Sequence, residues 1–178
     1  MQLSATDLFP LMKRFVLIII FFCFCVIAES QQRNVVLSMT ETPETVDNLV
    51  ESVIGEALKY IGTPYRWGGK TPAGFDCAGF TRYIYSKFGV TLSPSAPGQS
   101  KEGSKVAVGE ISKGDIVLYG ARGNKGAVGH VGIVTEVGES GFKFIHASNT
   151  GVRISSSNEP YYKSRFIGAR RVSHMAQL

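Results

Sequence analysis

Two helical segments followed by a series of short strands determine the kind of fold that this chain can adopt. Apolar residues recur at helical spacing over residues 45–61, with Thr45 as a candidate N-cap. A second helix is predicted to begin near Asp76 and to run to Lys87. From there on the pattern predicts strands, at residues 115–119, 130–137, 142–147, 152–155 and 166–172. This order is typical of an α+β domain, with N-terminal helices packed on a mainly antiparallel sheet of about five strands.

An apolar run near the N-terminus predicts that the protein is exported from the cytoplasm. The run covers residues 15–27, follows a Lys-Arg pair and ends just before small residues. A membrane-spanning helix needs roughly 20 apolar residues, so this run is short for one. The pattern is typical of a secretory signal peptide over residues 1–30, cleaved after Ser30, and an uncleaved anchor is the alternative. We therefore expect a protein exported to the periplasm, the cell wall or the medium, with no stable insertion in the membrane.

One domain is expected to follow. Residues 31–44 are polar without a period and predict a flexible leader, residues 45–174 form the domain, and residues 175–178 form a tail. Hydrophobic residues make up 44% of the chain and charged residues 19%, which allows a packed core and excludes global disorder. The polar segment 93–104 is predicted to be a loop. No repeat or second domain is evident, and we expect a monomer.

The net charge of the chain does not identify a binding partner. The formal net charge is +5, and it stays +5 when residues 1–30 are removed. A basic excess suits an anionic polymer such as a cell wall or a nucleic acid, but a solvated basic surface is the simpler interpretation. We therefore predict no nucleic-acid partner.

Cys77 is the only thiol outside the predicted signal peptide, so it cannot form an internal disulfide. A lone cysteine can simply be a small buried hydrophobic residue. Cys77 lies where the second helix should begin, however, and free N–H groups at a helix N-terminus favour the thiolate and can hold an oxyanion. A nucleophile of this kind also needs a histidine as its base, oriented by a third group.

Two histidines can reach such a cysteine together. His130 begins one strand of a predicted hairpin and His146 lies near the end of the next, whereas His174 lies in a tail without pattern, where an idle side chain is the simpler interpretation. The two even-numbered residues share a face only if the turn has an odd length, such as residues 138–140. His146 then faces Gly132, and His130 lies on the adjoining diagonal, with the Cα atoms roughly 7–8 Å apart. A turn of two or four residues would place the rings on opposite faces.

Six blocks of sequence together resemble the NlpC/P60 family of cysteine peptidases. They are YRWGG at 65–69, FDCAGF at 75–80, GDIV at 114–117, GHVGIV at 129–134, FIHAS at 144–148 and GARRV at 168–172. The blocks follow the family's order between residues 50 and 172, so their combination is much more specific than any one of them.

The resemblance implies a papain-like α+β catalytic domain that hydrolyses peptidoglycan stem peptides. The bond that it implies lies between D-γ-glutamate and a diamino acid such as meso-diaminopimelate. Cys77 would be the nucleophile, His130 the general base, and His146 the third polar residue that orients His130. Tyr65 and Asp76 match positions that line the family's substrate cleft, with Asp76 as a contact for a free amino terminus. For these two residues, ring packing and a helix cap are equally open alternatives. No metal and no cofactor are implied, since a thiol mechanism needs neither.

Two departures from the family pattern concern the cleft. Ala78 stands where the family commonly has a serine, and the segment Leu92-Ser93-Pro94-Ser95 lacks the arginine that the family has there. Neither change removes the nucleophile or its bases. Three alternatives stay open on the same fold: an N-acetylmuramoyl-L-alanine amidase, an acyl transferase and a non-catalytic wall-binding relative.

Overall fold

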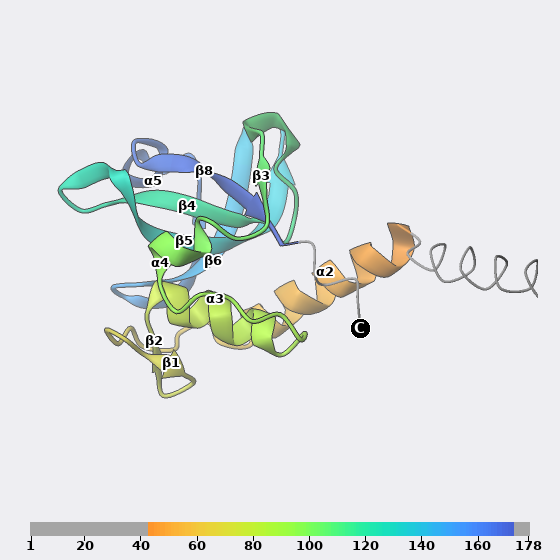
Figure 1. Cartoon of the computed structure of the whole chain (residues 1–178), viewed down its shortest axis with the longest axis horizontal. Coiled ribbons are helices and arrows are strands. Elements are labelled where there is room, and N and C mark those ends of the chain that lie inside the picture. Colours follow the sequence, from red (N-terminus) through yellow and green to blue (C-terminus); the bar gives the residue numbers. More distant parts are fainter. Residues whose placement is uncertain (1–42, 173–178) are drawn as a thin grey trace, which may run out of the picture. The chain divides into compact units, whose positions relative to one another are not determined.

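The computed structural model describes residues 43–172 of the chain. The predicted signal peptide, most of the predicted leader and the tail with His174 lie outside the described residues. Helices come first and most of the strands follow, as the α+β prediction requires (Figure 1). The elements are α2 (Pro43–Leu58), β1 (Lys70–Thr71), β2 (Gly74–Phe75), α3 (Cys77–Ser86), α4 (Ala96–Gln99), β3 (Ser104–Val106), the 3₁₀ helix η1 (Val108–Glu110), β4 (Ile116–Ala121), β5 (Asn124–Gly138), β6 (Gly141–Ser148), β7 (Gly151–Ser156), α5 (Pro160–Lys163) and β8 (Phe166–Arg171).

The main sheet has six strands in the order β3-β8-β4-β5-β6-β7, and every neighbouring pair is antiparallel. The strands β4 to β7 follow one another along the sheet as a meander. β8 returns to the other side of β4, where it also pairs with β3. β1 and β2 form a separate two-stranded hairpin just before α3.

Helix α3 packs on one face of this sheet, and α2 packs beside α3 (Figure 1). The buried side of α2 and α3 includes Val53, Phe80 and Ile84, and it meets Ile116 and Ile133 of the sheet. The opposite face of the sheet has its own apolar cluster, which includes Val117 and Phe144 and is covered by Tyr162 of α5. Alternate residues of β4 therefore face two different cores, which is why this strand is apolar throughout.

The structure differs from the sequence prediction in several elements. The sheet has six strands and not about five, because β3 begins at the end of the segment that was predicted as a loop. That segment also contains α4, a four-residue helix capped by the Ser95 side chain, which is too short to show a helical period. Helix α2 begins at Pro43, two residues before Thr45, and proline is well tolerated in a first helical turn.

The hairpin between β5 and β6 has a two-residue turn, Glu139-Ser140, closed by Gly138 and Gly141. The predicted odd-length turn is therefore wrong. The register nevertheless becomes the predicted one further along, because it shifts by one residue at Thr135, where Val134 pairs with Phe144 but Glu136 with Lys143. This bulge corrects the parity that the turn would otherwise impose.

The start of α3 is held by the loop before β1. Asp76 is the N-cap: its Oδ1 accepts the N–H of Gly79 at 2.6 Å and its Oδ2 accepts the N–H of Gly68 at 3.0 Å. The carbonyl of Gly69 accepts the N–H of Asp76 at 3.0 Å. A Cβ atom at Gly79 would collide with the Gly69 carbonyl, so the loop can lie this close to α3 only because residue 79 is glycine.

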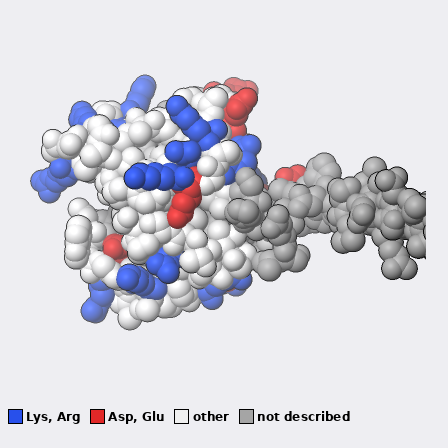
Figure 2. Space-filling model, viewed as in Figure 1, with Lys and Arg blue, Asp and Glu red and all other residues white. Residues whose placement is uncertain are grey.

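Lys and Arg side chains are spread over the face in view, with uncharged surface between them (Figure 2). This distribution is consistent with a solvated basic surface. Between residues 43 and 172, no helix combines the length and the hydropathy that crossing a bilayer takes.

Candidate active site

Cys77 is the first residue of α3, directly after the Asp76 N-cap, as the sequence predicted. Its residue surface is 9% exposed, and the side chain borders the core between the helices and the sheet. The backbone N–H groups of Val131 on β5, Ala78 and Cys77 lie near the sulfur and favour its charged form. The sulfur therefore lies between the beginning of α3 and the strand that carries His130.

The pKa of the Cys77 thiol is raised, which differs from the lowered pKa that its place at a helix N-terminus predicted. Burial is the main cause, and the Asp76 carboxylate adds to it. The three backbone N–H groups lower the pKa, but less than burial raises it. Formation of the thiolate therefore needs a proton acceptor beside the sulfur. The helix N-terminus cannot be that acceptor.

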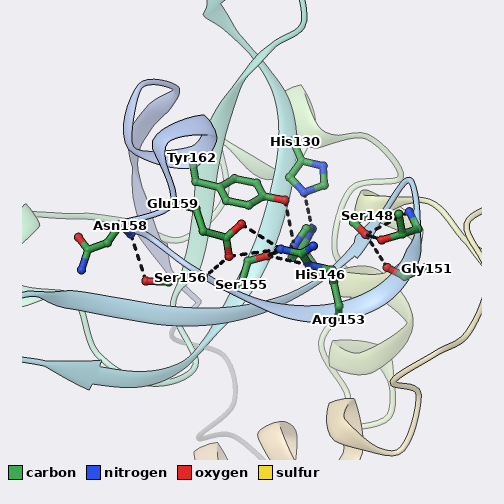
Figure 3. A network of polar contacts seen from close by, with 11 residues as sticks. His130, His146, Ser148, Gly151, Arg153, Ser155, Ser156, Asn158, Glu159 and Tyr162 are labelled. Atoms are coloured by element: carbon green, nitrogen blue, oxygen red, sulfur yellow. Dashed lines mark hydrogen bonds and ion pairs between the residues drawn. The ribbon is translucent and has the colours of Figure 1, made fainter.

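His130 on β5 and His146 on β6 form a hydrogen-bonded pair, with 2.8 Å between His130 Nε2 and His146 Nδ1. Their rings stand nearly perpendicular, at 88°, with 4.8 Å between the centroids (Figure 3). The bulge at Thr135 makes this contact possible, because it sets the pairing of Ile133 with Ile145. The predicted proximity of the two imidazoles is confirmed, although the turn that was expected to produce it is not.

Burial lowers the pKa of both histidines. For His130, which is half-buried, the pKa falls to about 4. His146 is fully buried, and its pKa is lowered further by the neighbouring His130 and by the charge of Arg153. Both rings are therefore neutral at pH 7, and each carries one hydrogen and one lone pair.

Three side chains that the sequence did not single out surround His146. Its Nε2 lies 3.0 Å from Ser155 Oγ and 3.3 Å from the Tyr162 hydroxyl. Arg153, the cross-strand partner of His146 on β7, donates to Ser155 Oγ from Nε at 3.0 Å and from Nη2 at 2.7 Å. Two residues along a strand share a face, so Arg153 and Ser155 could have been identified only once the β6–β7 register was known.

The two predicted cleft residues lie close to the nucleophile. Tyr65 is half-buried against the helical core, and its pKa is raised by burial, by Cys77 and by Asp76. Both carboxylate oxygens of Asp76 hold backbone N–H groups, so its role as a helix cap is established. A contact between either residue and a substrate stays a prediction.

The arrangement has the parts of a thiol-based acyl transfer site. A sulfur lies at a helix N-terminus, a neutral imidazole occupies the adjacent strand, and a second imidazole is hydrogen-bonded to the first. Over the described residues, no three His, Cys, Asp or Glu side chains gather as a metal site would need.

The model of the NlpC/P60 family matches residues 62–171. The Murein DD-endopeptidase MepS/Murein LD-carboxypeptidase of Escherichia coli strain K12 is 38% identical over 143 residues, which cover 76% of this chain and 72% of that protein. The Bifunctional muramidase/DL-endopeptidase CwlT of Bacillus subtilis is 33% identical over 123 residues, which cover 68% of this chain and 36% of that protein.

A solved structure of an NlpC/P60 family protein from Bacillus cereus has a TM-score of 0.63 and 33% identity, and the match covers 68% of this chain and 39% of that one. The chain thus spans little more than a third of the length of the Bacillus subtilis relative and of this solved protein. The matched blocks include the segments that carry Cys77, His130 and His146. The chain belongs to the NlpC/P60 family.

Proposed function

We propose that the chain is a cysteine peptidase that hydrolyses peptidoglycan stem peptides, at the bond between D-γ-glutamate and a diamino acid. The observation that carries the proposal is the 2.8 Å contact between His130 and His146, beside a cysteine whose thiolate is favoured by the backbone N–H of Val131, the residue after His130. The names of the relatives support it, because they describe peptidoglycan endopeptidases.

In the proposed reaction, His130 takes the proton of the Cys77 thiol, and the sulfur attacks the carbonyl carbon of the scissile amide. A C–S bond forms, and the resulting oxyanion is held by the backbone N–H of Cys77 at the start of α3. Collapse of this intermediate breaks the C–N bond, and His130 gives its proton to the leaving amine. Water, deprotonated by His130, then breaks the C–S bond, and the proton returns to the sulfur.

His146 orients His130 in this scheme, and burial keeps the base neutral at pH 7, with a lone pair on one ring nitrogen. Tyr65 and Asp76 are proposed to bind the peptide beside Cys77. The Asp76 oxygens each hold one backbone N–H and keep lone pairs for a free ammonium group. Because peptidoglycan lies outside the cytoplasm, we infer that the chain is exported by the signal peptide predicted over residues 1–30. We also propose that it acts as a monomer.

A second candidate bond is the D,D cross-link between stem peptides. The match to the Escherichia coli DD-endopeptidase favours it, because this relative is 38% identical and the match covers 72% of its length. The two bonds share the nucleophile and the bases and differ in the peptide that enters the cleft.

Mass spectrometry of digested muropeptides tests the proposal. Purified cross-linked muropeptides are incubated with the chain and with its Cys77→Ala variant. The proposed reaction leaves L-Ala-D-Glu on the muramic acid and releases a peptide that begins with the diamino acid, and it occurs with the unaltered protein but not with the variant. Conversion of dimers to monomers without this cleavage identifies the D,D bond, and stem peptides freed whole from the glycan identify an amidase. New amides formed with an added amine indicate a transferase, and identical spectra from both proteins contradict catalysis.

A further inference from the structure

Arg153 donates two hydrogen bonds to the hydroxyl oxygen of Ser155, from Nε at 3.0 Å and from Nη2 at 2.7 Å. The same guanidinium pairs with Glu159, with 2.9 Å between Nη2 and Oε2, and Glu159 in turn accepts the backbone N–H of Ser156 at 2.9 Å. Figure 3 shows these groups converging on the side of His146 that faces away from His130. The ion pair between Arg153 and Glu159 is thus linked to His146 through Ser155, and the proposed peptidase mechanism does not use it.

The direction of each hydrogen bond follows from the chemistry of the groups. A guanidinium only donates, so both of its contacts place N–H groups on Ser155 Oγ. With its lone pairs engaged, the Ser155 hydroxyl has its own hydrogen left to give, and His146 Nε2 lies 3.0 Å away to accept it. The hydrogen of neutral His146 must then be on Nδ1, where it points at His130 Nε2.

A hydrogen bond donated by His146 Nδ1 to His130 Nε2 disfavours protonation of His130, the proposed base. When His130 takes up a proton, both of its ring nitrogens carry hydrogens, so its Nε2–H needs an acceptor at His146 Nδ1. His146 must then move its hydrogen to Nε2, where it meets an oxygen already occupied by Arg153. The Tyr162 hydroxyl, 3.3 Å from Nε2, is the other group that can receive it.

We propose that Arg153 is a positioning residue that fixes the hydrogen of His146 on Nδ1 and so restrains His130 from accepting the thiol proton. The inference rests on the proposed peptidase function, because it assigns His130 the role of base. The groups that bear on His146 are His130 on β5, Arg153 and Ser155 on β7, Tyr162 on α5 and Glu159 just before α5. Among these groups, Arg153 and Glu159 carry opposite charges and can be changed one at a time.

Two variants of the full chain separate the proposal from simple damage. In Arg153→Met, the Ser155 hydroxyl is free to accept, and His146 is expected to shift its hydrogen to Nε2. Alkylation of Cys77 by iodoacetamide at pH 7 is then expected to rise about three- to tenfold, since one pKa unit of the histidine pair corresponds to a tenfold change. In Glu159→Gln, the guanidinium keeps its two bonds to Ser155 but loses its counter-charge, so alkylation is expected to fall.

Long-range ¹H–¹⁵N spectra of histidine-labelled protein report which ring nitrogen of His146 carries the hydrogen. Lys143→Met is the matched control, because it removes a cation that also pairs with a glutamate across strands, at 2.9 Å, without touching the histidines. Arg153→Ile, whose β-branched side chain suits a strand, replaces the methionine variant if that variant does not fold.

An unchanged His146 tautomer in either Arg153 variant overturns the proposal, as does a fall in alkylation in both Arg153→Met and Glu159→Gln. Neither readout depends on a peptidoglycan substrate. A wrong assignment of the scissile bond would therefore leave this result intact, whereas a wrong assignment of Arg153 would leave the muropeptide digest unchanged.

Discussion

The carbonyl oxygen of Gly69 lies against the α carbon of Gly79, at the point where the loop of the YRWGG block meets the first turn of α3. The contact joins two residues that lie ten positions apart, one in each of two sequence blocks. It fixes the N-cap Asp76 and, through it, the direction of the helix that begins with the nucleophile.

Alanine at position 79 is expected to destabilise the protein by at least about 2 kcal/mol, although alanine normally favours a helix by up to about 1 kcal/mol over glycine. The added Cβ would displace the Gly69 carbonyl, so hydrolysis should also weaken. Gly55 of α2 is the control, because a Cβ there meets nothing within 4 Å. Gly55→Ala should stabilise the chain by about 0.5–1 kcal/mol in urea unfolding. Equal effects of the two changes would contradict the contact.

The two histidines are expected to differ in their effect on turnover. His130→Ala removes the proposed base and should lower kcat by about 10³-fold or more, whereas His146→Ala removes an orienting group and should cost less. Steady-state rates of muropeptide hydrolysis measure both losses. Equal losses would mean that the roles are wrongly assigned.

Stability is expected to fall when the solution is made acidic. Burial lowers the pKa of His130 to about 4 in the folded protein, while an unfolded histidine titrates near 6.5. Between these values the unfolded state binds more protons, so the free energy of unfolding should drop as the pH falls from about 6.5 to about 4, by on the order of 2–3 kcal/mol.

Urea unfolding followed by circular dichroism at several pH values measures this slope, and His130→Asn should flatten it. A resting thiolate–imidazolium pair would raise the pKa of His130 instead. It would give stability that is lost as the pH rises, which would contradict the neutral pair described above.

The ion pair between Arg171 and Asp115 ties β8 to the beginning of β4. Asp115 is 1% exposed, and its carboxylate accepts from Arg171 Nε at 2.8 Å and from the backbone N–H of Ser112 at 2.8 Å. Arg171→Met leaves this buried charge with too few partners and should cost about 2–4 kcal/mol. Lys113→Met breaks the exposed pair with Glu51 and should cost less than about 0.5 kcal/mol in the same unfolding assay.

The sequence predicted those parts of the site that depend on local order. Asp76 and Cys77 follow a glycine-rich loop and precede an apolar helical face, so both the cap and the first residue of α3 could be identified. The pairing of His130 with His146 followed from strand alternation and a hairpin, which also act over short distances.

The remaining features depend on contacts that no local pattern encodes. β3 is a strand because it pairs with β8, more than sixty residues later, and the sequence of residues 104–106 shows no alternation of its own. The contact of Ser155 with His146, and that of Arg153 with Ser155, require the register of β6 and β7. The raised pKa of Cys77 reflects how closely α3 packs on β5, which the helix N-terminus alone could not reveal.

The extra residue at Thr135 makes the two ends of the β5–β6 hairpin independent of each other. Because the correction lies within the strand, the dipeptide that reverses the chain can be exchanged for another of the same length while both rings stay on one side of the sheet. Loss of that single threonine would instead turn one of the imidazoles toward the opposite layer, even with every catalytic side chain still present.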